Sequence, residues 1–508
     1  MRAGSVLQTP LPLLLRLVVG LSLLWLLGCE VGQEPEPDAV VHFGIANSAR
    51  TLDPRLATDA TSERINDLLY RALVKFDGNG RPVPDLAQWQ QLSARRYRVT
   101  LGTTGRRFSD GSWLTAQDVA ATYRSLLDPA TGSPHASQVE LIEQLRVLDD
   151  DRLEFELKRP DPLFTSYLGL GILPAAALAA GRDLARRPLG SGDFVLEAWP
   201  ESGRLRLRRR RDELRVEFVT VKDPSVRVMK LLRGEIQLLQ NNLAPELVGF
   251  LRQQSGVTVE TRSGVNFSYL GFNLDDPLLQ PLAVRQAIAE GIDRQAILHY
   301  LFQDLGRPAA ALLVPEHWAG APELTPVRYD PARARQRLAA LGYGPQRPLR
   351  LNYKTSSDPF WLRVASVLQA QLAQVGVELR IHSYDWGTFF GDIKAGRFQL
   401  YSLTWVGVRS PDIFRYAFHS ESIPPHGANR GRFRNAQADA LLERAREVSG
   451  IPSQAALYRA LQALLLRELP YVPLWYEDQV LARRQGLSGY TLAADGAYGG
   501  LSTVEWRP

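Results

Sequence analysis

Cysteine is almost absent from this sequence of 508 residues, in which only Cys29 occurs. A single sulfur atom excludes an internal disulfide framework and the C-x-x-C pairs of redox and zinc sites. Long apolar runs are lacking too: the uncharged stretch from Leu17 to Gly28 has 12 residues, whereas a helix needs about 20 to span a bilayer. With 45% hydrophobic and 22% charged residues, the composition indicates a soluble globular protein. The length predicts about three domains.

Lysine is also scarce, because six of the 60 basic residues are lysine and 54 are arginine. Such a general bias is typical of codon usage rather than of a nucleic-acid surface, so we expect no nucleic-acid partner. The one dense run, residues 204–211, alternates arginine with Leu205 and Leu207, as a half-exposed strand does. We expect its arginines to face solvent, and contacts with anions are the alternative.

Motifs of common enzymes are missing as well. The sequence contains no G-x-S-x-G and no H-E-x-x-H. His419 and His426 are the only close pair among seven histidines, and we expect them to be loop residues rather than metal ligands. The sequence therefore predicts no enzyme, no cofactor and no metal site.

Residues 1–28 predict a secretory signal, with basic residues before an apolar run that ends in Leu-Leu-Gly-Cys. This ending resembles the bacterial lipobox, in which the cysteine is lipidated before the signal is removed. The resemblance implies that Cys29 is the lipidated first residue of the mature protein, held by its acyl chains at a membrane in the periplasm or at the cell-envelope surface. A chance thiol in an ordinary signal is the alternative. Residues 29–38 then predict an acidic, proline-containing tether.

From residue 40 onward, short apolar runs alternate with helical periodicity, which predicts an α/β fold. We expect an antiparallel set within residues 194–221 and a substantially parallel sheet in the second half. Thr61 or Ser62 is the expected N-cap of the first helix, and Thr115 with Asp118 begins the second. The predicted strands are 40–46, 97–101, 153–157, 194–197, 204–208, 215–221, 349–354, 377–383 and 399–405. The predicted helices are 61–73, 115–127, 282–291, 292–301, 331–341, 360–375, 436–448 and 454–468.

A series of short motifs runs in order along nearly the whole chain. The most distinctive is FSDG at 108–111 followed by LTAQDV at 114–119. The others are LDP (52–54), LYRALV (69–74), PVPDLA (82–87), DPATGSPHAS (128–137), GSGDF (190–194), LRGEI (232–236), YLGFN (269–273), VRQAI (284–288), IDR (292–294), YDPARA (329–334), LGY (341–343), LAQVGV (372–377) and PYVPL (470–474). Together they resemble the oligopeptide and dipeptide class, family 5, of extracellular solute-binding proteins that serve bacterial ABC importers. Most of these motifs specify the scaffold rather than the ligand site.

The resemblance implies a periplasmic-binding-protein type II-like α/β fold, with two lobes, a hinge and an additional inserted domain. Lobe I would comprise residues 39–70, 188–268 and 479–508, the inserted domain 71–187, and lobe II 269–478. The ligand cleft would lie between the lobes, which close by hinge motion. The implied function is a monomeric receptor that binds peptides or peptide-like solutes and delivers them to an ABC permease and ATPase complex.

The segment after the strand at 399–405 departs from the family. Peptide-binding members have W-x-x-D there, and the aspartate pairs with the α-ammonium of the peptide, since an unpaired buried charge is costly. Here Trp405 is followed by Val-Gly-Val, which puts Val408 in the place of the aspartate. We expect either that Asp412 replaces the carboxylate from a shifted loop or that the ligand lacks a free α-amine there. Arg409 would suit an acidic group of the ligand, with a solvated loop arginine as the alternative.

Main-chain pairing with an extended peptide is expected at two further segments. One runs from Gly190 to Phe194 and includes Gly192 and Asp193, and the other runs from Asn266 to Asn273. Candidate pocket aromatics, for which core packing is the alternative, are Tyr269, Tyr384, Trp386 and Trp405.

Two other functions fit the same scaffold. One is a lipoprotein that acts as an envelope sensor or chaperone without transport. The other is a receptor for a non-peptide solute, such as a metal chelate or an oligosaccharide.

Overall fold

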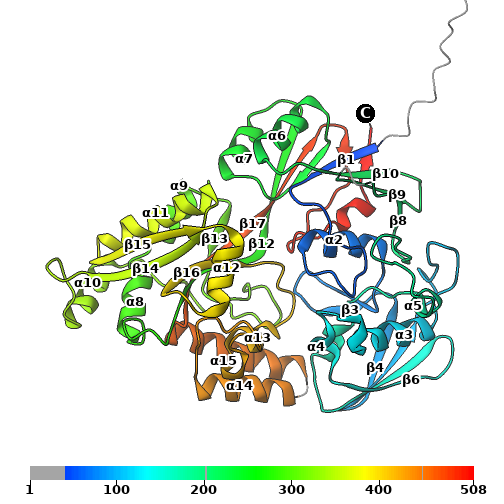
Figure 1. Cartoon of the computed structure of the whole chain (residues 1–508), viewed down its shortest axis with the longest axis horizontal. Coiled ribbons are helices and arrows are strands. Elements are labelled where there is room, and N and C mark those ends of the chain that lie inside the picture. Colours follow the sequence, from blue (N-terminus) through cyan, green and yellow to red (C-terminus); the bar gives the residue numbers. More distant parts are fainter. Residues whose placement is uncertain (1–39, 201–202, 449, 508) are drawn as a thin grey trace, which may run out of the picture.

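The structure is a computed structural model that describes residues 40–200, 203–448 and 450–507. The predicted signal, the lipidation site Cys29 and the tether lie outside these residues. A large mixed sheet of 11 strands and a separate sheet of four strands organise the chain. Figure 1 shows two halves joined by the long strands β12 and β17, with the four-stranded sheet beside the half that contains β1. In the described part of the chain, no helix combines the length and the apolarity needed to cross a membrane.

Strand β1 (Val40–Ile45) lies in the middle of the first half. It pairs in parallel with β10 (Arg215–Thr220) and β11 (Leu238–Gln240). Strands β9 (Arg204–Arg209) and β8 (Phe194–Ala198) continue antiparallel from β10, which confirms the antiparallel set predicted at 194–221. The helices of this half are α2 (Ala60–Leu69), α6 (Pro224–Arg233) and α7 (Pro245–Arg252).

The arginines of β9 do not simply face solvent, as the alternating pattern predicts. The leucines between them are buried as expected. Arg204 and Arg206, however, both bind the carboxylate of Glu217 on β10, with N–O distances of 2.9 Å. Arg209 is buried because the C-terminal segment covers it, and it donates to backbone carbonyl groups at 501 and 504. The solvent-facing prediction is therefore wrong for Arg209.

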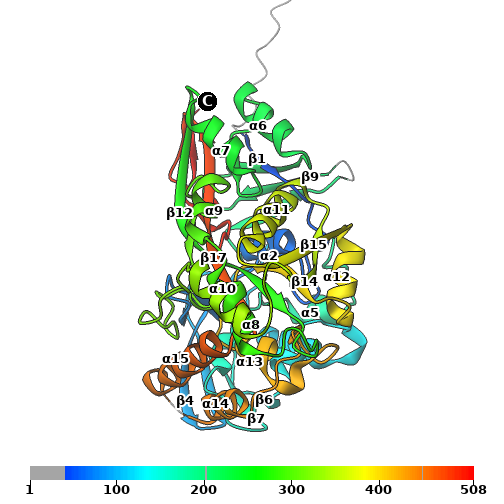
Figure 2. The same cartoon turned by 90° about the vertical axis from the view of Figure 1, so that its left-hand side faces the viewer.

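Two long antiparallel strands, β12 (Val257–Phe272) and β17 (Tyr471–Arg484), belong to both halves of the molecule. Figure 2 shows them side by side along its length. Their register shifts between residues 262 and 266 and between 268 and 269, and such irregularities bend and twist a strand pair locally. The boundaries expected at 268/269 and 478/479 fall within these strands, and the division into lobes at those residues stays a prediction.

The second half contains β14 (Leu349–Ser356), β15 (Val377–Tyr384) and β16 (Leu400–Trp405), paired in parallel through β14. The expectation of a substantially parallel sheet holds for these three strands, but β12 is antiparallel to β16 and to β17. Because β17 is buried along most of its length, its sequence lacks the polar and apolar alternation that identifies a strand. Helices of this half are α8 (Leu282–Glu290), α9 (Arg294–Tyr300), α10 (Pro331–Ala340), α11 (Pro359–Ala373), α12 (Trp386–Ala395), α13 (Ile413–Phe418), α14 (Ala436–Glu447) and α15 (Ile451–Glu468).

The four-stranded sheet has the order β4-β5-β7-β6 and packs against α3 (Ala116–Leu127) around its own buried cluster of residues 73–172. Thr115 is the N-cap of α3, as predicted, and it forms a capping box with Asp118. For α2 the predicted N-cap is wrong: Asp59 caps this helix and accepts from the Ser62 amide at 2.9 Å. The strands and short helices not yet named are β2 (Val74–Phe76), β3 (Pro82–Pro84), β4 (Ala87–Ser93), β5 (Arg96–Leu101), β6 (Ile142–Val147), β7 (Arg152–Leu157), β13 (Gly306–Pro308), β18 (Leu487–Ser488), β19 (Glu505–Trp506), α4 (Ala136–Val139) and α5 (Ala175–Ala179).

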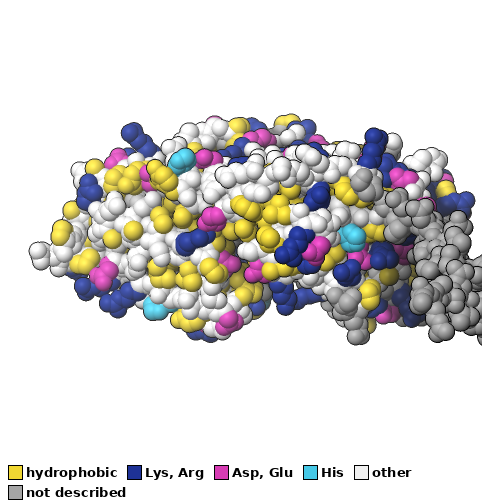
Figure 3. Space-filling model, turned by 90° about the horizontal axis from the view of Figure 1, so that it is seen from above, with side chains coloured by type: hydrophobic (Ala, Val, Ile, Leu, Met, Phe, Trp, Pro, Cys, Tyr) yellow, Lys and Arg dark blue, Asp and Glu magenta, His cyan; other side chains and the backbone are white. Residues whose placement is uncertain are grey.

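On the face seen in Figure 3, acidic and basic side chains are interspersed. This mixture fits a general arginine bias better than a surface built to bind nucleic acid.

Candidate functional site

The loop after β16, residues 406–412, connects the two halves by an ion pair. The Nε of Arg409 donates to Oδ2 of Asp495 at 2.8 Å, and its guanidinium lies 3.6 Å from Oδ2 of Asp67 in α2. Both carboxylates belong to the half built around β1. In this conformation the charge of Arg409 is balanced by protein carboxylates, and its predicted contact with an acidic ligand group stays a prediction.

His317 also contacts this loop. Its Nε2 donates to the backbone carbonyl of Arg409 at 3.1 Å, and its Nδ1 accepts from the Ala319 amide at 3.1 Å. These two contacts require the neutral ring with its proton on Nε2. Burial lowers the pKa of His317 to about 4, so the ring is neutral at pH 7. Gly80 lies against this ring, where a Cβ atom would approach Nε2 to 2.4 Å.

Asp412, the proposed replacement for the missing carboxylate, faces the segment 71–187. Burial raises the pKa of Asp412, and its interaction with Tyr167 opposes this rise. Asp161 lies nearby with 1% of its surface exposed, and burial raises its pKa to about 6. Arg446 approaches Asp161 to 4.0 Å. Asp412 is thus half-buried among groups of the protein, and its role as an amine anchor stays a prediction.

An aromatic pocket lies in the second half, at the end of β16. Tyr269 and Trp405, both predicted as pocket aromatics, line it together. Its cavity volume is about 20 Å³, so the surrounding side chains nearly fill it in this conformation. Val408 packs against the same apolar cluster. The other lining residues are Phe267, Tyr401, Ala417, Phe418, Ala428, Asn429, Arg430, Gly431, Phe433, Pro470 and Tyr471.

Arg430 is the one charged residue that lines the aromatic pocket. Its guanidinium carbon lies 4.9 Å from the ring centre of Trp405 and 5.4 Å from that of Phe390, and Nη1 donates to the Tyr269 hydroxyl at 3.3 Å. Its Nε is buried without a hydrogen-bond partner. Among the described residues no carboxylate forms an ion pair with it. Sequence analysis missed Arg430 because none of the recognised motifs contains it.

Glu477 on β17 is a second charged group that the sequence did not indicate. Its Oε1 accepts from the Ser268 hydroxyl at 2.6 Å and from the Thr404 hydroxyl at 3.3 Å. Burial raises the pKa of Glu477. Because successive residues of a strand face opposite sides, Ser268 and Thr404 lie on the other face of the sheet from the aromatic pocket. Glu477 therefore does not share a site with Arg430.

Three other predicted ligand residues do not line the aromatic pocket. Asn273 donates to the backbone carbonyl groups of Gly396 and Phe398 and so fixes a loop. Trp386 begins α12, is 59% exposed and stacks on Phe390. The ring of Tyr384 lies 5.0 Å from the Lys354 ammonium.

Of the two segments expected to pair with a peptide, the one in β12 is not a free edge. Residues 267–272 of β12 pair with β16 on one side and with β17 on the other, so the prediction of an open strand edge is wrong for them. In the other segment, the Gly192 amide donates to the Leu69 carbonyl at 2.8 Å. A Cβ atom at Gly192 would lie 2.3 Å from the carbonyl oxygen of Leu68, so this close approach requires glycine. This segment leads into β8, the last strand of the large sheet, and its pairing with a peptide stays a prediction.

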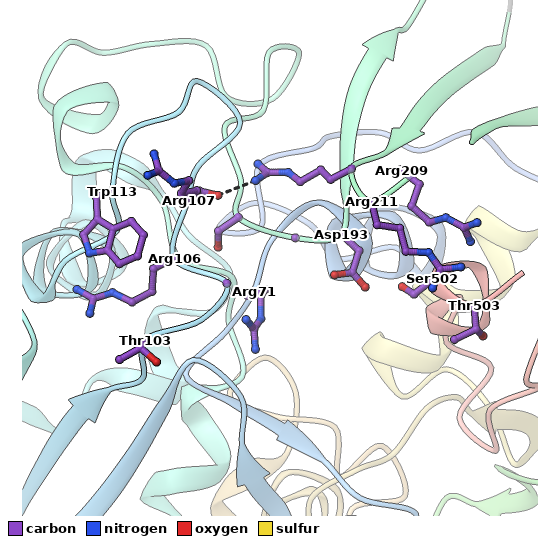
Figure 4. Close-up of a pocket in the computed structure, with 14 residues that line it drawn as sticks. Arg71, Thr103, Arg106, Arg107, Trp113, Asp193, Arg209, Arg211, Ser502 and Thr503 are labelled. Atoms are coloured by element: carbon purple, nitrogen blue, oxygen red, sulfur yellow. Dashed lines mark hydrogen bonds between the residues drawn. The ribbon is translucent and has the colours of Figure 1, made fainter. Parts of the chain in front are cut away.

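Asp193, next to Gly192, lines a different cavity, between the inserted segment and the β1 half (Figure 4). The structure thus brings Tyr269, Trp405 and Val408 together but places Gly192 and Asp193 elsewhere.

The described ranges contain no group of three or more histidine, cysteine, aspartate or glutamate side chains that could hold a metal ion. The Nε2 of His419 lies 3.1 Å from Glu443, and its Nδ1 accepts from the Glu421 amide. His419 is therefore engaged with groups of its own lobe.

The structure has two α/β halves, which share two long strands and contact each other through a charged loop. This is the architecture of a two-lobed ligand-binding protein. The chain belongs to the bacterial extracellular solute-binding proteins, family 5, whose family model matches residues 81–423. This is a family of receptors.

Curated and solved proteins agree with this assignment. The chain is 28% identical over 464 residues to di/tripeptide-binding protein 2 of Pseudomonas aeruginosa UCBPP-PA14, covering 84% of this chain and 87% of that protein. The crystal structure of the substrate-binding protein CtaP from Listeria monocytogenes is similar with a TM-score of 0.83 and 21% identity, covering 93% of this chain and 100% of that one. DppA from Helicobacter pylori in complex with the peptide STSA has a TM-score of 0.77 and 24% identity, covering 92% and 98%. The predicted type II-like fold is confirmed.

Proposed function

We propose that this protein is the receptor of an ABC importer, rather than an enzyme, and that it binds peptides or peptide-like solutes between its lobes. A relative named for di- and tripeptides matches most of the chain, and a protein of the same fold holds a peptide. The observation that carries the proposal is Arg430, a cation without a carboxylate partner among aromatic rings. Ligand pockets are typically apolar with a few polar groups that orient the ligand, and Arg430 suits the carboxylate of a peptide.

Val408 makes the mode of amine recognition unusual. With valine in the position of the family's aspartate, a free α-ammonium gains no ion pair there, and a charge buried without one is disfavoured. We therefore expect the protein to bind an N-acetylated tripeptide at least as well as the same tripeptide with a free amine.

The substitution Val408→Asp tests this expectation. It supplies a carboxylate and should raise the preference for the free amine by about tenfold, since a hydrogen bond to a charged group contributes about 1.5–3 kcal/mol. Isothermal titration with both peptides measures the ratio. Val406→Asp is the matched control, because Val406 lies in the same loop and is 53% exposed. A strong preference of the unmodified protein for the free amine would show that another group anchors it. A protein that binds neither peptide would favour the sensor or non-peptide alternatives.

We also propose that Cys29 is lipidated and anchors the receptor to a membrane outside the cytoplasm, where it serves a permease as a monomer. The family is described as extracellular, and the apolar run before the cysteine supports the anchor. Cys29→Ala should move the protein from the membrane fraction to the soluble fraction, measured by fractionation and immunoblotting. Unchanged retention in the membrane fraction would contradict the anchor.

A further inference from the structure

A second cavity, of about 590 Å³, lies where the segment 71–187 meets the half built around β1. Its walls come from residues 71–113, 191–193, 209–211 and 502–503. No residue of the aromatic pocket contributes to it, so a ligand here would not occupy the proposed peptide site. Its volume lies within the range of roughly 300–1,000 Å³ that is usual for pockets that bind small molecules.

The walls of this cavity are strongly basic. Six arginines line it, together with the single acidic residue Asp193. Figure 4 shows Arg106, Arg107 and Trp113 on one side and Asp193, Arg211 and Ser502 on the other. The lining arginines are Arg71, Arg106, Arg107, Arg209, Arg210 and Arg211.

Protein carboxylates balance only part of this charge. Three of the arginines have close ion-pair partners, which are Asp85 for Arg71, Asp151 for Arg106 and Asp212 for Arg209, at 2.6–2.7 Å. Arg211 shares Asp212 at 3.3 Å. Arg107 and Arg210 form no ion pair with any residue that the structure describes.

Arg210 is fixed in place by the backbone and not by an acid. Its Nη1 donates to the Arg107 carbonyl at 2.8 Å, the dashed line in Figure 4, and its Nη2 donates to the Gly190 carbonyl at 2.9 Å. Its Nε is buried without a hydrogen-bond partner. The acidic groups that act on its charge are Asp193 and Asp110.

Ser191 gives an independent indication of a ligand. It is 4% exposed, lines the cavity, and its hydroxyl group has no hydrogen-bond partner. Buried polar groups are almost always paired, so an unpaired hydroxyl and an unpaired guanidinium nitrogen in residues that line one cavity need an explanation. An anion with several oxygen atoms offers acceptors for both groups.

We propose that this cavity binds a phosphate-bearing molecule, with its phosphate held by Ser191 and Arg210. A phosphate offers enough oxygen acceptors for a hydroxyl and a guanidinium group, and arginine matches its geometry. Trp113, 47% exposed and on the same side of the cavity as Arg107, supplies an apolar surface for the organic part. The cavity is also larger than a phosphate ion alone requires.

The same headgroup chemistry is found in free phosphate esters and in membrane phospholipids, and the experiment has one arm for each source. In the first arm, inorganic phosphate, pyrophosphate and adenosine 5′-monophosphate are titrated into the full chain at low ionic strength. In the second, phosphatidylcholine vesicles with and without phosphatidic acid are tested by co-flotation. Binding in the first arm identifies a free phosphate compound, and tighter binding of adenosine 5′-monophosphate than of inorganic phosphate identifies a phosphate ester. Binding in the second arm alone identifies a lipid headgroup.

Ser191→Ala is the decisive variant, because the hydroxyl group has no hydrogen-bond partner among the described residues and its removal should leave the unliganded melting temperature unchanged. We expect this variant to lose about tenfold in affinity for the bound probe. Arg210→Gln should lose at least as much. Arg233→Gln, an exposed change on α6, and Arg430→Gln in the aromatic pocket should bind the probe as the unmodified protein does. The proposal is overturned if no probe binds, if Ser191→Ala and Arg210→Gln bind as tightly as the unmodified protein, or if Arg430→Gln abolishes binding.

Discussion

Arg430 places a positive charge among aromatic rings, and no carboxylate of the described residues forms an ion pair with it. Its contacts are the Tyr269 hydroxyl and the faces of Trp405 and Phe390. A cation over an aromatic face is stabilised by only about 0.5–2 kcal/mol, so a ligand carboxylate can still add substantially to its interactions. We therefore expect this residue to determine which end of a ligand the pocket prefers.

The substitution Arg430→Gln should weaken binding of a tripeptide with a free carboxylate by roughly tenfold to a hundredfold, because it removes a hydrogen bond to a charged group. The same tripeptide with a C-terminal amide should lose little, which makes the difference between the two peptides the measured quantity in titration calorimetry. Arg434→Gln is the control, since Arg434 is exposed and pairs with Asp275. Equal losses for both peptides would mean that Arg430 acts on the fold and not on the carboxylate.

The sequence predicted some members of this site and missed others for a physical reason. Tyr269, Trp405 and Val408 lie in or beside segments with family motifs, so position alone placed them near the ligand. Arg430 and Asp495 come from segments without such motifs. Only the tertiary fold brings them to the site, and their distance from the other residues in space cannot be read from the spacing of residues along the sequence.

At the scale of elements, predictions that depend on residues close together in the sequence were correct for α3. The start of α3 depends on two residues three positions apart, Thr115 as N-cap and Asp118 in the first turn, and both lie where they were predicted. Strands β12 and β17 were missed because their pairing joins residues about 200 positions apart and because β17 is buried on both faces. The open edge expected within 266–273 failed for the same reason, since β16 and β17 already pair with β12 there.

The loop after β16 should respond to pH through His317. The ring is neutral in the folded protein and its pKa is lowered to about 4 by burial, compared with about 6.5 in an unfolded chain. The unfolded state therefore binds the proton more tightly between these values. The stability that the neutral ring supports is complete above pH 6.5 and is lost as the pH falls toward 4, by up to about 3 kcal/mol.

Urea unfolding at pH 7.5 and pH 4.5 measures this effect by comparison with His317→Gln, which keeps a donor for the Arg409 carbonyl but cannot take up a proton. The unmodified protein should lose more stability than the variant between the two pH values. His382→Gln, an exposed change on β15, should behave like the unmodified protein. Parallel losses in the unmodified protein and in His317→Gln would exclude His317 as the titrating group.

At the scale of the whole molecule, the two halves share a pair of strands and contact each other through side chains. Arg409 pairs with Asp495 and Asp67, and Asp412 interacts with Tyr167. Such contacts can open without disturbing the core of either half, while β12 and β17 remain continuous. A ligand that binds both halves would shift the population toward the closed form, which a permease can recognise.

The central claim is that a peptide or peptide-like solute occupies the space between these halves. Native mass spectrometry of the full chain, mixed with a library of di- and tripeptides, tests it most directly. The account predicts one-to-one complexes with a subset of the library, and fewer complexes for Arg430→Gln than for Arg434→Gln. A spectrum that shows only the unbound protein across the whole library would contradict the account.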